Sequence, residues 1–338
     1  MFLLVTTPLQ IVLENVGKKT SSVIRTGDGY YFGISHSQGN FVLVTARFLQ
    51  YFSRNTKPFY SRTLLKQAHQ VEWVEDKILV ADTGNNSLVV FNNQGEFLER
   101  IYFNEIKQDD KDRGRTGNHF NSVHRVRDRV YVVAHNYEKP SEIWVLSWPG
   151  LEVVDRIVTK AAWAHNVWEC EWGLVICDSR HGSLYDVISG ETVWKSDEPK
   201  AFTRGLAATK DFIFVGCSVY QERKERYWKS GKVWILDRKT LRLLDEIPLP
   251  GSGDVQELRI VGEIDECHNG EVIEKQDLEA IRRRSLVIQA SYLLRQKYPA
   301  LQRDVFPLSQ LVRGVQILPR WQKKIKSGFS QDIHILAV

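Results

Sequence analysis

The chain has 338 residues, of which 43% are hydrophobic and 26% charged, an ordinary balance for a globular protein with a sizeable core. Its formal net charge of +5 is small, and one Met beside 10 Trp, 12 Tyr and 15 Phe indicates strand-rich packing. The sequence contains no Walker loop, GxSxG elbow, HExxH motif or paired CxxC, so the enzyme classes defined by those signatures are not indicated.

The first segment, MFLLVTTPLQIVL, is apolar but carries neither the basic region nor the small-residue cleavage site of a signal peptide. No run of 18 apolar residues occurs, so no membrane span is predicted. The four cysteines form no paired pattern, and Cys177 and Cys217 fall inside apolar runs, where a thiol behaves as a small hydrophobe. We therefore expect a cytoplasmic protein in a reducing compartment.

Residues 71–103 contain the clearest local pattern, which reads as four short strands at 71–74, 77–82, 87–91 and 96–103. Turn-forming residues separate them, among them the runs Thr-Gly-Asn-Asn and Asn-Asn-Gln-Gly. Four antiparallel strands joined by tight turns are one blade of a β-propeller.

Further copies of this pattern recur along the chain. Each copy opens on an apolar anchor, and the six anchors are Val23, Val71, Val123, Val167, Leu206 and Val255. Their spacings of 48, 52, 44, 39 and 49 residues are those of propeller blades. The sequence therefore predicts an all-β fold, a six-bladed propeller spanning residues 1–338 as a single domain. The two terminal segments, MFLLVTT and DIHILAV, are expected to pair and close the ring, since an open edge invites aggregation.

Three segments interrupt the repeat. Residues 104–118 and 219–231 are polar insertions, of the kind that often carries function in a compact propeller. Residues 276–298 have apolar side chains at helical spacing and predict a C-terminal helical insertion that covers the ring or decorates its last blade.

Aligning the repeats on their anchors brings polar residues into register just before each innermost strand. Two residues before their anchors stand His69, Asn121, His165 and Arg204, and His119 lies two residues further back, on the same side of an extended chain. Gln256 and Glu257 fall near the corresponding place in the last blade. Innermost strands surround the channel of a propeller, so these side chains are expected to ring its mouth.

Such a ring of imidazoles, guanidinium and carboxylate favours a functional site. We expect His69, His119 and His165 to hold a divalent metal such as Zn²⁺, Fe²⁺ or Mn²⁺. The predicted catalytic residues are His119 and Glu257 for proton transfer and Arg204, which also grips an anionic group; Asn121 and Gln256 complete the substrate-binding set. Two alternatives stay open: a metal-free pocket for an anion, and channel side chains that only bind ordered water.

Two resemblances follow from these residues. The run VADTGNNSLVVFNNQGEF is similar to an NHL repeat. The polar motifs across residues 69–257 resemble those of uncharacterised bacterial propeller proteins, which are sometimes fused to tetratricopeptide repeats or found with sulfotransferases. The motif residues that carry this resemblance are His69, His119, Asn121, His165, Arg204, Gln256 and Glu257. Ser122 and Asn118 depart from that pattern, and the resemblance implies a fold and a site rather than a reaction.

The function expected from the sequence is metal-dependent chemistry of a lyase, hydrolase or oxygenase type on a small anionic or sugar-like substrate. The alternative is a non-catalytic propeller that binds an anionic ligand or a protein partner. Residues 282–326 carry eleven Lys or Arg and a single acid, Asp304, so this basic segment is a candidate surface for a protein partner. Nucleic acid is not an expected partner.

Overall fold

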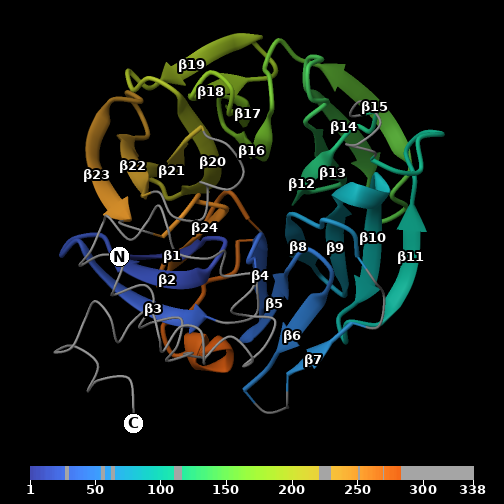
Figure 1. The fold of residues 1–338 in the computed structure, drawn as a ribbon, viewed down its shortest axis with the longest axis horizontal. Helices are drawn as coiled ribbons and strands as arrows, with labels where there is room; N and C mark the ends of the chain where they lie inside the picture. Colours follow the sequence, from blue (N-terminus) through green and yellow to red (C-terminus); the bar gives the residue numbers. More distant parts are fainter. Residues whose placement is uncertain are drawn as a thin grey trace, which may run out of the picture.

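Six four-stranded antiparallel sheets stand around a central axis as the blades of a propeller (Figure 1). The computed structural model describes residues 1–26, 30–54, 58–61, 65–109, 116–220, 230–249, 252–268 and 270–282. The six four-stranded sheets confirm the predicted all-β, six-bladed propeller.

The strands fall into four positions along each blade. Innermost, around the channel, are β4 (Gly33–Ser37), β8 (Val71–Val74), β12 (Phe120–Val126), β16 (His165–Cys170), β20 (Ala201–Ala208) and β24 (Glu257–Val261). Second strands are β5 (Asn40–Val44), β9 (Lys77–Asp82), β13 (Arg129–Ala134), β17 (Gly173–Asp178), β21 (Phe212–Val219) and β1 (Phe2–Thr6). Third strands are β6 (Leu49–Phe52), β10 (Ser87–Asn92), β14 (Glu142–Ser147), β18 (Ser183–Asp186), β22 (Gly231–Asp237) and β2 (Gln10–Asn15). Outermost are β7 (Phe59–Tyr60), β11 (Phe97–Ile101), β15 (Val153–Val158), β19 (Glu191–Lys195), β23 (Leu243–Leu249) and β3 (Thr20–Thr26).

The ring is closed by a blade that combines the first three strands of the chain with β24. Its order is β24-β1-β2-β3, with Leu4 opposite Arg259 across the β24–β1 pair and opposite Leu13 across the β1–β2 pair. Both edges of β1 are therefore occupied, and the predicted pairing of MFLLVTT with DIHILAV is wrong. The segment DIHILAV itself lies outside the described residues.

Four of the six predicted anchors lie in the innermost strands of their blades, one lies just before such a strand, and one lies in an outer strand. Val71, Val123, Val167 and Leu206 lie in the innermost strands β8, β12, β16 and β20, and Val255 lies just before β24. Val23 instead belongs to β3, the outer strand of the closing blade, and the innermost strand of the next blade begins at Gly33. The error arose because the first three strands of the chain, β1–β3, complete the closing blade with β24. The first blade made of four consecutive strands therefore begins at β4 and not near Val23.

Burial along a blade explains the run of apolar residues in the second strands. In β9 every residue after Lys77 is buried, because both faces of the strand pack against neighbouring blades. In β15, by contrast, five of the six residues are exposed. Hydrophobic clusters fill the spaces between successive blades, where each buried Leu or Ile side chain contributes about 1.5–3 kcal/mol.

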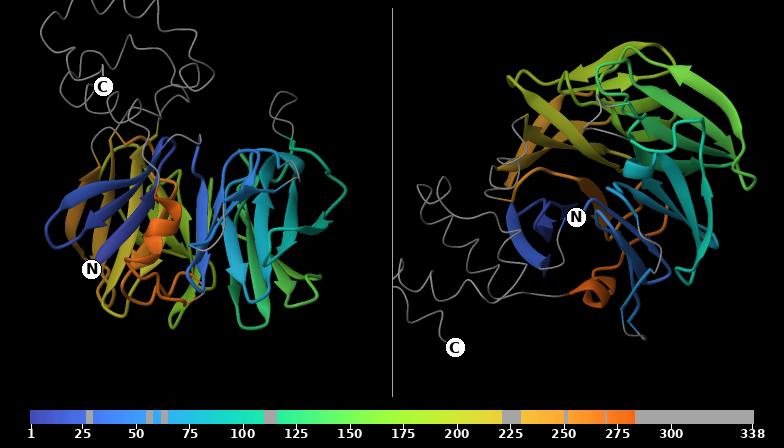
Figure 2. Two further views of the ribbon diagram at one scale, coloured as in Figure 1. Left: turned by 90° about the horizontal axis from the view of Figure 1, so that it is seen from below. Right: turned by 45° about the vertical axis from the view of Figure 1, so that its right-hand side comes forward.

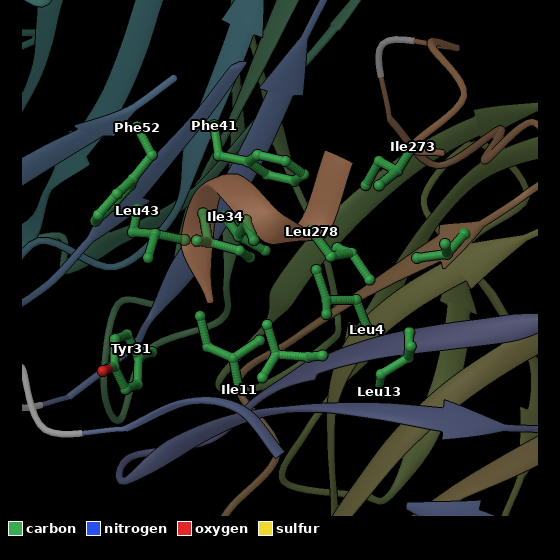
Figure 3. Close-up of a cluster of buried hydrophobic side chains, with 13 residues drawn as sticks. Leu4, Ile11, Leu13, Tyr31, Ile34, Phe41, Leu43, Phe52, Ile273 and Leu278 are labelled. Atoms are coloured by element: carbon green, nitrogen blue, oxygen red, sulfur yellow. The ribbon is translucent and has the colours of Figure 1, made fainter. Parts of the chain in front are cut away.

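Two short 3₁₀ helices complete the fold, η1 (Thr83–Asn85) and η2 (Asp277–Ile281). The helix η2 lies between the closing blade and the blade formed by β4–β7 (Figure 2). Its Leu278 packs with Leu4, Ile11, Ile34 and Phe41 (Figure 3). This is the part of the predicted insertion 276–298 that the structure describes; residues from 283 onward, including nearly all of the basic segment 282–326, lie outside the described residues. Over the described ranges, no helix has the length and apolar character needed to cross a membrane.

Candidate functional site

Four histidines lie side by side at the channel end where the innermost strands begin. The ring centroids are 5.2 Å apart for His69 and His119, 5.0 Å for His119 and His135, and 5.7 Å for His135 and His165. We call this group the histidine end. It brings together the three predicted histidines and adds His135.

His69 and His165 are held by matching contacts in two different blades. Nδ1 of His69 lies 2.7 Å from the Gln67 carbonyl and 2.7 Å from the Thr83 hydroxyl. Nδ1 of His165 lies 2.8 Å from the Trp163 carbonyl and 2.8 Å from the Ser179 hydroxyl. A carbonyl oxygen only accepts, so Nδ1 carries the proton in both neutral rings and the lone pair is on Nε2.

His119 is held by a carboxylate instead. Its Nδ1 lies 2.8 Å from Asp109 Oδ2, and the Tyr137 hydroxyl donates to the same carboxylate at 2.6–2.7 Å. Asp109 is 3% exposed, so these hydrogen bonds are shielded from water. A carboxylate on Nδ1 orients the imidazole and makes Nε2 more basic, as in histidines that transfer protons or bind metals.

His135 has the opposite tautomer. The backbone N–H of Tyr137 donates to its Nδ1 at 3.0 Å, so the proton of the neutral ring is on Nε2. The site predicted from the sequence did not include His135. This residue directly follows the second strand β13, as Thr83 follows β9 and Ser179 follows β17, so aligning the second strands would have found it.

Arg204 and several aromatic rings border the histidine end. The Arg204 guanidinium carbon is 5.9 Å from the Phe32 ring centroid, and Phe32 packs on His69 at 4.9 Å. On the other side Trp163 stacks parallel to His135 at 6.0 Å, and Phe202 packs on His165 at 5.5 Å. Burial, and then the charge of Arg204, lower the pKa of His165 well below its usual value, so this ring is neutral at pH 7.

Asn121 and Glu257 lie deeper in the channel and connect the blades. A β-bulge between Phe120 and Ser122 turns Asn121 toward the next blade, where its amide donates to the Ala164 carbonyl at 2.9 Å. Glu257 is 1% exposed and accepts from the amides of Gln70 at 2.6 Å and Asn166 at 3.3 Å. Burial raises the pKa of Glu257.

Gln256 stands at the start of β24, and its Nε2 donates to the Asp254 carbonyl at 3.4 Å. Its Oε1 is buried with no hydrogen-bond partner in the described part of the chain. The structure thus gathers His69, His119, His165 and Arg204 at one end, with Asn121 and Glu257 one layer below.

The metal-binding potential of the site follows from these contacts. His69, His119 and His165 all present Nε2 with a lone pair, the form in which imidazole binds Zn²⁺, Fe²⁺ or Mn²⁺. Across the described ranges, however, no group of three or more His, Cys, Asp or Glu side chains is arranged to hold a metal ion. His135, with its Nε2 proton, stands between His119 and His165.

Comparisons with known proteins support the fold. A family model described as a 6-bladed beta-propeller matches residues 51–103, which is the second blade and the outer edge of the first. The chain is similar to one in the "Crystal structure of Nidogen/Laminin Complex", with 10% identity, a TM-score of 0.56, and coverage of 76% of this chain and 97% of that chain. It is also matched to the computationally designed Ika8 protein, with 12% identity, a TM-score of 0.42, and coverage of 79% and 77%. No curated protein matches the sequence. At 10% identity, the likeness to the chain of the Nidogen/Laminin complex concerns the fold alone.

Proposed function

We propose that the histidine end is an active site for a small anionic or sugar-like substrate, with His119 as its proton-transfer group. The observation that carries this proposal is the Asp109–His119 pair at 2.8 Å within a row of imidazoles. Burying a carboxylate against one imidazole has a free-energy cost that simple packing does not require. The arrangement is the one used by histidines that act as general bases or acids.

In this proposal the neighbouring residues divide the remaining work. Arg204 binds the anionic group of the substrate through paired N–H donors, and the Nε2–H of His135 donates a further hydrogen bond. Trp163 and Phe32 offer ring faces to the apolar side of a sugar. The resemblance to propeller proteins found with sulfotransferases makes a sulfated sugar one candidate substrate, beside sugar acids and sugar phosphates.

Asp109 has a positioning role here. Its carboxylate fixes the His119 tautomer and stabilises the imidazolium that forms when Nε2 accepts a proton. Removing that carboxylate should slow turnover while substrate binding through Arg204 persists.

Metal-dependent chemistry is the second candidate, and one observation favours it. The Nδ1 atoms of His69, His119 and His165 all contact oxygen acceptors, which is how metal-binding imidazoles are usually oriented. A metal bound by the three Nε2 atoms would supply a Lewis acid or an activated water. His165 would have to approach the other two rings for all three to bind one ion.

The test uses protein purified without a histidine tag and a panel of sugar acids, sulfated sugars and sugar phosphates. Binding is followed by calorimetry and turnover by NMR. His119→Gln and Asp109→Asn are expected to lower turnover about 10²–10⁴-fold with little loss of binding, while Arg204→Gln weakens binding. Binding without turnover, and without an effect of His119→Gln, would leave the non-catalytic module as the function.

Metal content separates the two candidates. Stoichiometric Zn, Fe or Mn that is lost from a His69→Ala/His165→Ala double variant would establish the metal-dependent mechanism. Turnover that survives dialysis against a chelator, with no metal retained, would establish the metal-free one.

A further inference from the structure

The opposite end of the channel holds a second cluster of buried ionisable side chains, distinct from the proposed active site. It consists of Glu72 on β8, His124 on β12, Arg259 on β24, and His268, which follows β24. We call this group the glutamate end. Glu72 is 0% exposed, His124 and Arg259 are each 3% exposed, and His268 is 9% exposed.

Glu72 and His124 have side-chain polar atoms for which the described residues supply no hydrogen-bond partner. Both oxygens of Glu72 and both nitrogens of His124 are buried without one in the described part of the chain. The nearest groups to the Glu72 oxygens are Nη2 of Arg259 at 3.6 Å and Nδ1 of His124 at 3.9 Å, which are too far for hydrogen bonds. Leaving buried polar atoms unsatisfied is costly, so such atoms usually have a ligand or water as partner.

His268 adds a further acceptor to this cluster. Its Nε2 donates to the Leu258 carbonyl at 3.0 Å, so the lone pair of the neutral ring is on Nδ1. That Nδ1 lies 3.9 Å from Glu72 Oε2. The Glu72 carboxyl group and the imidazole lone pair of His268 are therefore close but too far apart for a direct hydrogen bond.

A pocket of about 340 Å³, large enough for a small organic ligand, lies against this cluster. Its lining includes Glu72, His124 and His268, and it carries five glutamates against two arginines. The glutamates at its rim already have partners: Glu75 pairs with Arg125 at 3.0 Å, and Glu169 accepts from Tyr131 at 2.7 Å. The unsatisfied acceptors are thus at the deep end.

A cation bound here would lie beside carboxyl groups whose pKa burial raises, to about 8 for Glu72, and its charge would favour their ionised forms. Three carboxyl groups, those of Glu72, Glu257 and Asp265, surround one guanidinium, that of Arg259. Burial of His124 and His268, and then the charge of Arg259, lower the pKa of both, so neither imidazole adds positive charge. Burial raises the pKa of Asp265 to about 7, although hydrogen bonds at 3.0–3.3 Å from the backbone N–H groups of Ile260, Ala208 and Cys267 favour its ionised form.

We infer that the glutamate end is a second binding site, for a small molecule bearing a protonated primary amine. The ammonium group supplies three N–H donors and favours the ionised form of Glu72, so that Glu72, His124 and His268 all act as acceptors. Glu72 Oε1 is 3.9 Å from His124 Nδ1, and Glu72 Oε2 is 3.9 Å from His268 Nδ1. An ammonium nitrogen placed between the two atoms of either pair can therefore make hydrogen bonds of about 2.8–3 Å to both.

A metal ion fits these atoms less well. At about 2.1 Å from both atoms, a metal would need an angle near 135° between ligands, far from the tetrahedral value. Consistent with this, the residues described here include no group of three or more metal-ligating side chains with suitable geometry.

The test measures binding of propylammonium chloride to the full chain by calorimetry up to about 10 mM. Saturable one-to-one binding is expected, with no binding of 1-propanol, which lacks the charge, and much weaker binding of tetramethylammonium, which lacks the N–H donors. Equal binding of tetramethylammonium would overturn the assigned acceptors, and no saturable binding of propylammonium would show that the pocket holds only water.

Variants then locate the site. Glu72→Gln is expected to weaken propylammonium binding at least about tenfold, whereas Glu75→Gln, at the rim of the same pocket, changes it less than about twofold. His119→Gln, at the other end of the channel, should have no effect. Unchanged binding in Glu72→Gln would refute the proposal; His124→Asn serves as the second variant if Glu72→Gln does not fold.

Discussion

His69 and His165 lie in different blades and make the same two contacts at the same sequence distances. Each Nδ1 contacts a backbone carbonyl two residues earlier and a hydroxyl fourteen residues later. Those hydroxyls, of Thr83 and Ser179, donate in turn to carbonyls of the following blade, those of Phe120 and Thr203. The two histidines are therefore positioned by the propeller repeat itself.

The first prediction concerns the tautomers that follow from these contacts. NMR of ¹⁵N-labelled protein near pH 7.5 should find His69, His119 and His165 with the proton on Nδ1, and His135 with the proton on Nε2. The physical reason is the acceptor or donor that faces each Nδ1. Nε2-protonated rings for His69 and His165 would contradict the proposed orientation of the site.

A large part of the fold could be read from residues 71–103. Their four predicted strands match β8, β9, β10 and β11 within two residues at each end, because tight turns and apolar runs are local properties. The closing blade could not be read in this way, because β1 pairs with β24 through contacts between distant parts of the chain. Val23 was misassigned for that reason.

The site was predictable to the extent that it follows the repeat. His69, His165 and Arg204 follow it directly. Asn121 does not: the register of β12 shifts between Phe120 and Ser122, whereas that of β16 shifts between His165 and Val167, so Asn121 corresponds to Asn166 rather than to His165. Local sequence does not reveal where such a bulge lies. Asp109 comes from a polar insertion, so its contact with His119 required the three-dimensional structure.

The second prediction concerns the hydroxyls that hold the histidines. Thr83→Val should lower the free energy of unfolding by about 1–3 kcal/mol, because it leaves the buried Phe120 carbonyl without its donor. Urea unfolding followed by tryptophan fluorescence measures the change. The exposed Thr192→Val serves as a control and should stay within about 0.5 kcal/mol of the parent. Equal effects of the two substitutions would argue against a buried hydrogen-bond role for Thr83.

The third prediction concerns η2 as part of the core. Leu278→Ala should destabilise the protein by about 2–4 kcal/mol, because Leu278 is 0% exposed and packs between two blades (Figure 3). Glu279→Ala is the matched control: its side chain is 61% exposed and pairs only with neighbouring Arg282, so little change is expected. Thermal unfolding compares both variants. A Leu278→Ala protein as stable as Glu279→Ala would mean that η2 is not needed to seal this part of the ring.

The last prediction concerns the pH dependence of stability that Glu72 introduces. Burial raises the pKa of Glu72 from 4.5 to about 8. Between these values the folded protein binds a proton that the unfolded chain has released, so the free energy of unfolding falls as pH rises. Asp265, whose pKa burial raises to about 7, acts in the same direction.

Glu72→Gln removes one of these contributions, so its stability should decline less than that of the parent between about pH 5 and pH 8. The expected difference in decline is about 1–2 kcal/mol, from urea unfolding at several pH values. Glu75→Gln provides the control, because the Glu75 side chain is 57% exposed and its curve should run parallel to that of the parent. A parallel curve for Glu72→Gln as well would mean that Glu72 is already ionised in the folded protein, stabilised by Arg259.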